Sequence, residues 1–125
     1  GSKTSIVPTS DGYRELNCIE APEVLFWDVV KVTHEGFVNI FDIDKMFLEV
    51  CEFGSLKVVS SNCEEPIVCG AGMYSPTSFY IKTSKKENAV FTLILSGVRK
   101  GFSGRRFAER TKEDFESNMS FWANV

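Results

Sequence analysis

The cysteines and the single histidine are the residues that could do metal or nucleophilic chemistry. His34 is the only histidine, and no cysteine belongs to a C-x-x-C pair; the cysteines are Cys18, Cys51, Cys63 and Cys69. Zinc sites of the usual kind draw on closely spaced Cys and His pairs, which this set cannot supply. Catalysis by a Cys/His pair needs the histidine within hydrogen-bond reach, and His34 beside Glu35 is typical of a surface turn. The sequence therefore predicts no metal, no cofactor and no enzyme activity.

Cationic side chains gather toward the C-terminus of a chain that is acidic overall. The formal net charge is −3, from 14 Lys and Arg against 17 Asp and Glu, which gives no general basic footprint for nucleic acid. Residues 11–65 are mostly acidic, whereas residues 82–112 are rich in Lys and Arg. Such asymmetry can mark a docking face for an acidic partner, although a solvated rim of long side chains is the simpler interpretation. We expect a partner-binding surface bordered by Lys100, Arg105, Arg106 and Arg110.

The cysteine content also bears on the compartment. Cys51 lies in an apolar run and is expected to be a small buried residue, which favours a reduced, cytoplasmic protein. The alternative is a secreted β-sandwich recognition domain in which the four cysteines pair as two disulfides. No apolar run is long enough to span a membrane, so membrane contact would be peripheral. Gly1-Ser2 is typical of the remnant of a cleaved expression tag.

Strand-like segments fill most of the chain after residue 14. Residues 1–14 are polar and predict a flexible arm, and residues 15–125 predict one domain. Runs rich in β-branched and aromatic residues predict strands at 23–33, 37–43, 46–53, 55–60, 79–83 and 89–95, with a short one at 66–69. Breaks at 34–36, at Gly54 and at 84–88 are expected to be hairpin turns, and 70–78 a loop. Most of the 11 phenylalanines should lie in the core.

The C-terminal segment changes period and predicts a helix. Thr111 followed three residues later by Asp114 is a capping-box-like start. Phe115, Met119 and Trp122 then fall on one stripe of a helix, which must pack against something because a helix this short is marginal alone. A run of strands followed by one helix predicts an antiparallel α+β fold. We expect a seven-stranded half-barrel of the pleckstrin-homology type, capped by this helix.

A resemblance to one family lies in the same region. Residues 102–122 (FSGRRFAERTKEDFESNMSFW) are similar to the end of the pleckstrin-like ear domain of the NECAP endocytic adaptors, whose pattern is F-x-G-x-G-F, an acidic-Arg pair, then F-[DE]-x-N. Ser78–Lys82 is similar to a strand segment of the same family. Position 106 is Arg where the pattern has Gly, and one extra residue lies between Arg110 and Phe115. The matching residues are Phe102, Gly104, Phe107, Arg110, Phe115, Glu116 and Asn118.

The resemblance implies an adaptor domain of endocytic or membrane trafficking. Such a domain would bind a protein or peptide motif, acidic and aromatic in character, along a strand edge or beside the helix. Binding of an anionic lipid or phosphoinositide is an alternative. The turn at 32–36 offers only Lys31 as a neighbouring cation, so a lipid site would have to use the basic stretch 99–112.

Overall fold

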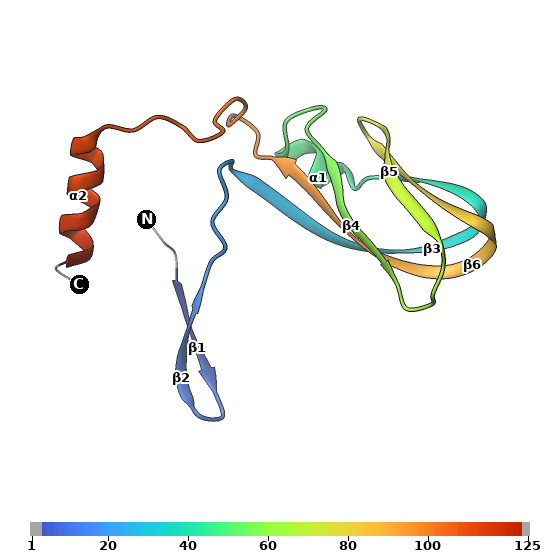
Figure 1. Cartoon of the computed structure of the whole chain (residues 1–125), viewed down its shortest axis with the longest axis horizontal. Coiled ribbons are helices and arrows are strands. Elements are labelled where there is room, and N and C mark those ends of the chain that lie inside the picture. Colours follow the sequence, from blue (N-terminus) through green and yellow to red (C-terminus); the bar gives the residue numbers. More distant parts are fainter. Residues whose placement is uncertain (1–3, 124–125) are drawn as a thin grey trace. The chain divides into compact units, whose positions relative to one another are not determined.

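The computed structural model describes the backbone of residues 4–123 and the side chains of residues 4–118. It divides the chain into a sheet unit, Glu23–Arg105, and a second unit formed by the segments on either side. This division differs from the predicted boundary at residue 15. The described residues form six strands and two helices (Figure 1). The broad α+β prediction is confirmed, but the predicted seven strands are six, and the described strands do not close into a barrel.

Two long antiparallel strands form most of the sheet, with one of them central and the other at an edge. They are β3 (Leu25–Asp42) and β6 (Ser78–Val98), which pair along almost their whole length. The predicted hairpin turns at 34–36 and 84–88 are therefore wrong. The two polar breaks face each other in the ladder, with Gly36 opposite Glu87, and the register shifts just after Gly36. Both strands bend back together at this point, as Figure 1 shows, and neither strand ends there.

His34 stabilises the bend from inside. Its side chain is fully buried and meets the ring of Phe91 edge-on, with ring centroids 5.8 Å apart. Its Nε2 donates to the carbonyl oxygen of Gly36 at 2.8 Å and lies 3.1 Å from Thr83 Oγ1. The Thr83 hydroxyl donates in turn to the carbonyl of Lys85 at 2.7 Å. The prediction that His34 is an exposed turn residue is wrong, because it ties the two bent strands together.

Two shorter strands flank β6 on the side opposite β3. β4 (Lys57–Cys63) pairs with the second half of β6 and β5 (Cys69–Ser75) with the first half. The predicted loop at 70–78 is therefore mostly strand. Glycine in this strand gives room to Tyr80, because a Cβ at Gly72 would come within 2.9 Å of the phenol oxygen. A glycine-rich sequence here reflects close packing of a side chain, not a turn.

The core of the sheet unit is supplied mainly by alternate residues of β6. Burial alternates along this strand because successive side chains point to opposite faces. Only part of the phenylalanine prediction holds: Phe79 and Phe91 are buried, whereas Phe37, Phe53, Phe107 and Phe115 are exposed. The buried apolar residues are Ile43, Cys51, Leu56, Phe79, Ile81, Ala89, Phe91, Leu93 and Leu95.

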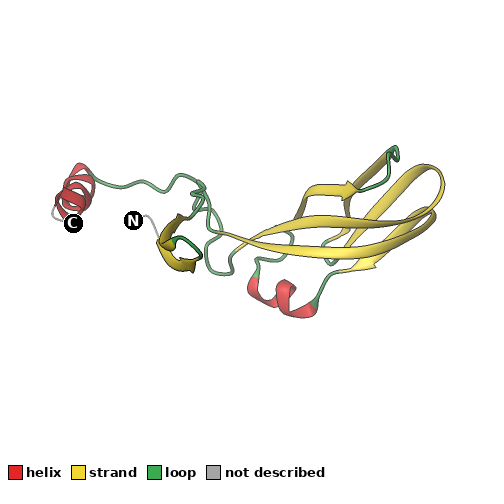
Figure 2. Ribbon diagram, turned by 90° about the horizontal axis from the view of Figure 1, so that it is seen from below, coloured by secondary structure: helices red, strands yellow, loops and turns green. Residues whose placement is uncertain are grey.

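A short helix, α1 (Lys45–Val50), occupies the segment predicted as a strand at 46–53. The carboxylate of Asp44 accepts a hydrogen bond from the Met46 amide at 2.8 Å, which caps the first turn. Figure 2 shows α1 as the short red helix beside the strands of the sheet unit. The helix ends at Cys51, whose buried side chain confirms the prediction for this cysteine.

The N-terminal flanking segment is a hairpin of β1 (Thr4–Thr9) and β2 (Gly12–Asn17). Gly12 has φ +91°, a left-handed conformation that glycine adopts without strain, and it closes the tight turn. The Thr9 hydroxyl donates to the Gly12 carbonyl at 2.6 Å. The structure thus has a regular hairpin where polar composition predicted a loose arm over 1–14.

The C-terminal flanking segment contains α2 (Lys112–Ala123), which confirms the predicted helix. Its capping box is formed: the Asp114 amide donates to Thr111 Oγ1 at 3.1 Å, and the Thr111 amide donates to the Asp114 carboxylate at 3.0 Å. Phe115, expected in the core, is 63% exposed, and α2 is not part of the sheet unit. The burial expected of Phe115 is therefore wrong. The side chains of Met119 and Trp122 lie outside the described residues.

Candidate protein-binding surface

A short segment after β6, Arg99–Arg105, carries cationic and aromatic side chains. The Arg99 amide donates to the carbonyl of Val24 at 2.9 Å, and the Lys100 amide donates to that of Val50 at the same distance. These bonds tie the segment to the residue before β3 and to the end of α1. Its side chains are thereby held at one end of the sheet unit.

The connection between α1 and β4 is fastened to the same place. The Glu52 amide donates to the Val98 carbonyl at 2.8 Å, and the Val98 amide donates to Ser55 Oγ at 3.0 Å. The Glu52 carboxylate accepts a hydrogen bond from the Gly101 amide at 2.7 Å. Phe53, at the tip of this connection, is 80% exposed. An apolar ring is therefore presented to solvent on a connection that several hydrogen bonds hold.

Two guanidinium groups lie near the ring of Phe102. The Arg99 guanidinium is 4.9 Å from the ring centroid of Phe102 and that of Arg105 is 5.0 Å away. Both distances fall within the range of cation–π attraction. Arg99 also lies 5.7 Å from the ring of Phe26. A guanidinium that rests on a ring still has N–H groups on its edge for a carboxylate.

Phe53, Phe102 and Arg105 border an open hollow of about 350 Å³, which we name the Phe53–Phe102 hollow. Its wall combines two phenylalanine rings, one arginine and two acidic side chains. The hydrogen bond from the Gly101 amide already engages the Glu52 carboxylate. The lining residues are Glu23, Glu52, Phe53, Gly54, Ser55, Val98, Phe102, Ser103, Gly104 and Arg105.

The predicted site residues divide between the two units. Lys100 and Arg105 belong to the sheet unit, and Arg105 lines the Phe53–Phe102 hollow. Arg106 and Arg110 belong to the second unit. The Arg106 guanidinium lies 5.3 Å from the ring of Phe107, and Arg110 pairs with the Asp114 carboxylate at 3.3 Å. The structure thus brings two of the four together in one unit.

Sequence reasoning missed Phe53 as a surface residue. It was assigned to a strand because MFLEVCEF is dense in apolar residues. A signal was present, since Gly54 follows it and has φ +80°, the conformation of a turn. Phe102 was noted only for its match to a family pattern, although its position between Arg99 and Arg105 was readable from the sequence.

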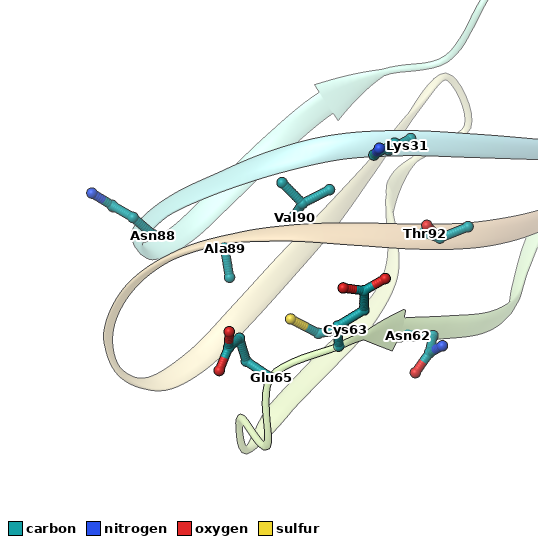
Figure 3. A pocket seen from close by; sticks show the side chains of 9 residues that line it. Lys31, Asn62, Cys63, Glu65, Asn88, Ala89, Val90 and Thr92 are labelled. Carbon is teal, nitrogen blue, oxygen red and sulfur yellow. The ribbon is translucent and has the colours of Figure 1, made fainter.

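A second, larger hollow of about 530 Å³ lies over the part of the sheet formed by β3, β6 and β4. Figure 3 shows Lys31 on one strand, Thr92 on the central strand, and Cys63 and Asn62 on the third. One cation and the carboxylates of Glu64 and Glu65 line it, so its charge is mixed. The only imidazole in the chain, His34, is fully buried at the bend and offers no exposed base to a substrate.

All four cysteines carry free thiols, so the disulfide pairs of the secreted alternative are not formed. Cys18 and Cys69 are exposed, Cys63 is half-buried and Cys51 is buried. Burial raises the pKa of the Cys51 thiol. Within residues 4–123 no group of three or more His, Cys, Asp or Glu side chains could hold a metal ion.

Neither helix in the described part of the chain is long and apolar enough to cross a membrane. No family model, no curated protein and no solved structure matches the chain. The NECAP-type resemblance therefore stays a prediction.

Proposed function

We propose that the sheet unit is a non-enzymatic protein-binding module, which takes a short partner segment into the Phe53–Phe102 hollow. The observation that carries this proposal is the exposed ring of Phe53 at a hollow that Phe102 and Arg105 also line. Aromatic and arginine side chains at concave surfaces are the residue types that contribute most to protein–protein binding energy. Figure 1 shows the connections that carry them at one end of the sheet unit.

The partner segment that fits this surface has an aromatic or aliphatic side chain next to a carboxylate. The apolar side chain would contact Phe53, and the carboxylate would accept hydrogen bonds from the guanidinium edge of Arg105. Lys100 adds a second cation nearby in the chain, which would speed the encounter with an acidic partner. The Gly101 amide engages Glu52 and so reduces the repulsion that a partner carboxylate would meet.

An intracellular adaptor of endocytic or membrane trafficking is the context that the NECAP-type resemblance implies, and we retain it, with the pleckstrin-like fold, as part of the proposal. Binding of an anionic lipid headgroup is the second candidate, favoured by three cations within Arg99–Arg105. Peptide selection and vesicle binding distinguish the protein-binding candidate from the lipid-binding one.

The test is a selection of random peptides displayed on phage against the immobilised full chain. We expect enriched peptides in which an aromatic residue is flanked by Asp or Glu. Phe53→Ala and Arg105→Glu should each weaken the enriched peptides by about tenfold or more, because each removes an anchor or reverses an attraction. Lys86→Glu is the matched control, since it reverses an exposed positive charge on β6 and should leave binding unchanged.

Melting temperatures of all variants should stay close to that of the wild type, because the substituted side chains contribute little to the core. Peptides that bind Arg105→Glu as tightly as the wild type would refute the site. Failure to enrich any peptide, together with Arg105-dependent binding to phosphoinositide vesicles, would favour the lipid alternative.

A further inference from the structure

One edge of β3 has no partner strand. β3 pairs with β6 along one side, and no strand within residues 4–123 pairs with it along the other. An edge strand presents a row of unpaired N–H and C=O groups, which is a template for another extended chain. Natural proteins protect such edges with proline, bulges or charges. Between Leu25 and Thr33 the strand has no proline, no glycine and no register shift, and Asp28 and Lys31 are its only charged residues.

The side chains along this part of β3 alternate strictly. Trp27, Val29 and Lys31 are exposed on the outer face, whereas Asp28 and Val30 on the other face are half-buried. Trp27 is 55% exposed and Val29 is 65% exposed. Unpaired backbone thus lies next to apolar side chains that a neighbouring strand would cover.

We infer that a second copy of the chain occupies this edge. The two β3 strands pair antiparallel around a two-fold axis that passes through Val29 and stands perpendicular to the sheet, so that the two sheets become one. Self-pairing of an edge is the closed, isologous arrangement that most homodimers use.

Repulsion between like charges restricts the register. Residues directly opposite in antiparallel strands share a face, so the axis must pass through a residue position. An axis through Asp28 or Lys31 would place like charges opposite each other, which is destabilising. An axis through Val29 places Val29 against its own copy and Asp28 against an uncharged residue, Val30. Lys31 therefore does not block the edge but restricts its register.

The same register supplies a specific contact. Trp27 of one copy lies opposite Lys31 of the other, twice by symmetry, and a lysine over an indole gives a cation–π attraction. Leu25 of each copy then lies opposite Thr33 of the other, so the edge is paired along the whole of residues 25–33. The register shift after Gly36 ends the straight edge, and the Asn39 side chain accepts a hydrogen bond from the Glu35 amide there.

The first test is sedimentation equilibrium of the full chain over a wide concentration range. We expect a reversible dimer for the wild type. Val29→Lys should weaken it by about a hundredfold or more, because two lysines meet at the axis beside the two copies of Lys31. Val38→Lys is the matched control: Val38 is 53% exposed on the same strand but lies beyond the register shift, so its variant should dimerise as the wild type does.

The second test uses disulfide cross-linking to determine the register in which the two β3 strands pair. In a background where Cys18, Cys63 and Cys69 are replaced by serine, mild oxidation should cross-link Val29→Cys into a dimer, because the two positions face each other. Thr33→Cys should not cross-link, since in this register the two copies lie ~26 Å apart, eight residues at the rise of a strand. The cross-link also gives an answer if Val29→Lys folds poorly.

Three outcomes overturn the inference. The first is a monomer at all concentrations, as expected if the edge binds another segment of its own chain or a different protein. The second is a dimer that Val29→Lys leaves intact, and the third is a cross-link through Thr33→Cys in preference to Val29→Cys. Arg105→Glu should leave the dimer unchanged, so the peptide site and the dimer edge are tested separately.

Discussion

Phe91 in the sheet unit and Phe115 in helix α2 differ in burial although each lies on an amphipathic element. Phe91 is fully buried in β6, where it contacts His34 at the bend, whereas Phe115 in α2 is 63% exposed. β6 and α2 both have amphipathic sequences, yet the ring of Phe91 is covered by other side chains and that of Phe115 is not. The position of an element is specified locally, but burial is decided by residues far away in the sequence.

The two regions also differ in what stabilises them. The sheet unit has a core drawn from both halves of β6 and from the α1–β4 region. α2 begins at a capping box, and two exposed ion pairs lie at its start: Arg110 with Asp114 at 3.3 Å and Lys112 with Glu116 at 3.8 Å. Exposed pairs of this kind contribute little, and a helix of this length is marginal in water. We therefore expect α2 to be the less stable region.

The largest expected effect is the difference in stability loss between truncating the buried Phe91 and truncating the exposed Phe115. Phe91→Ala should lower the free energy of unfolding by about 3–5 kcal/mol, because it leaves a cavity in a closed core. Phe115→Ala should change it by no more than about 0.5 kcal/mol, as is usual for an exposed site. Urea unfolding measured by circular dichroism gives both values. Equal losses for the two variants would mean that Phe115 is buried and that the contrast between the regions is wrong.

A second prediction concerns the close contact between β6 and the end of α1. A Cβ at Gly97 would lie 2.5 Å from Cys51 Sγ and 2.9 Å from its Cβ, closer than atoms can approach. Gly97→Ala should therefore cost about 1–3 kcal/mol of stability through overpacking. Gly70→Ala is the matched control, because a Cβ there meets no atom within 4 Å and the backbone conformation is not left-handed.

The cause of the Gly97→Ala loss can be isolated by a double-mutant cycle. Cys51→Ala removes the sulfur atom that the new methyl group would contact. Cys51→Ala should therefore lower the stability of the Gly97→Ala protein by less than it lowers the stability of the wild type. Urea unfolding of the four proteins gives the coupling. Strictly additive losses would show that Gly97 is required for another reason.

Local signals predicted the elements that depend on local contacts. The cap at Thr111 and the alternation within β3 and β6 were readable because each involves neighbours in the sequence. The bend was not, since the polar residues at 34–36 and 84–88 look like turns until they are placed opposite each other in a ladder. Gly72 was assigned to a loop because nothing in the sequence shows that Tyr80 lies over it.

The candidate site was predictable to a similar extent. Its cations, Lys100 and Arg105, stood out because charge is visible in composition. Phe53 did not, because exposure of an apolar ring depends on how α1 and β4 are joined to the end of β6. Arg106 and Arg110 were grouped with Lys100 by sequence proximity alone, and the division of the chain after Arg105 separates them into different units.

The smallest expected effect is a pH dependence at the start of α2. Hydrogen bonds from the backbone and side chain of Thr111, with a smaller contribution from Arg110, hold the pKa of the Asp114 carboxyl below its ordinary value. A carboxyl whose pKa is lower in the folded state stabilises that state when ionised. This contribution is therefore fully present above the ordinary pKa of aspartate and is lost as the pH falls through the lowered value.

The effect should be local, because Asp114 lies at the surface of a helix outside the sheet unit. In NMR spectra of the full chain, the amides of Thr111 and Asp114 should shift together as the pH falls through the acidic range. Asp114→Asn should abolish that titration while leaving the amides of Phe91 and its neighbours unchanged. If the amides of β6 titrated with the same midpoint, the two regions would be coupled, and the stability of α2 would no longer be a local property of its cap.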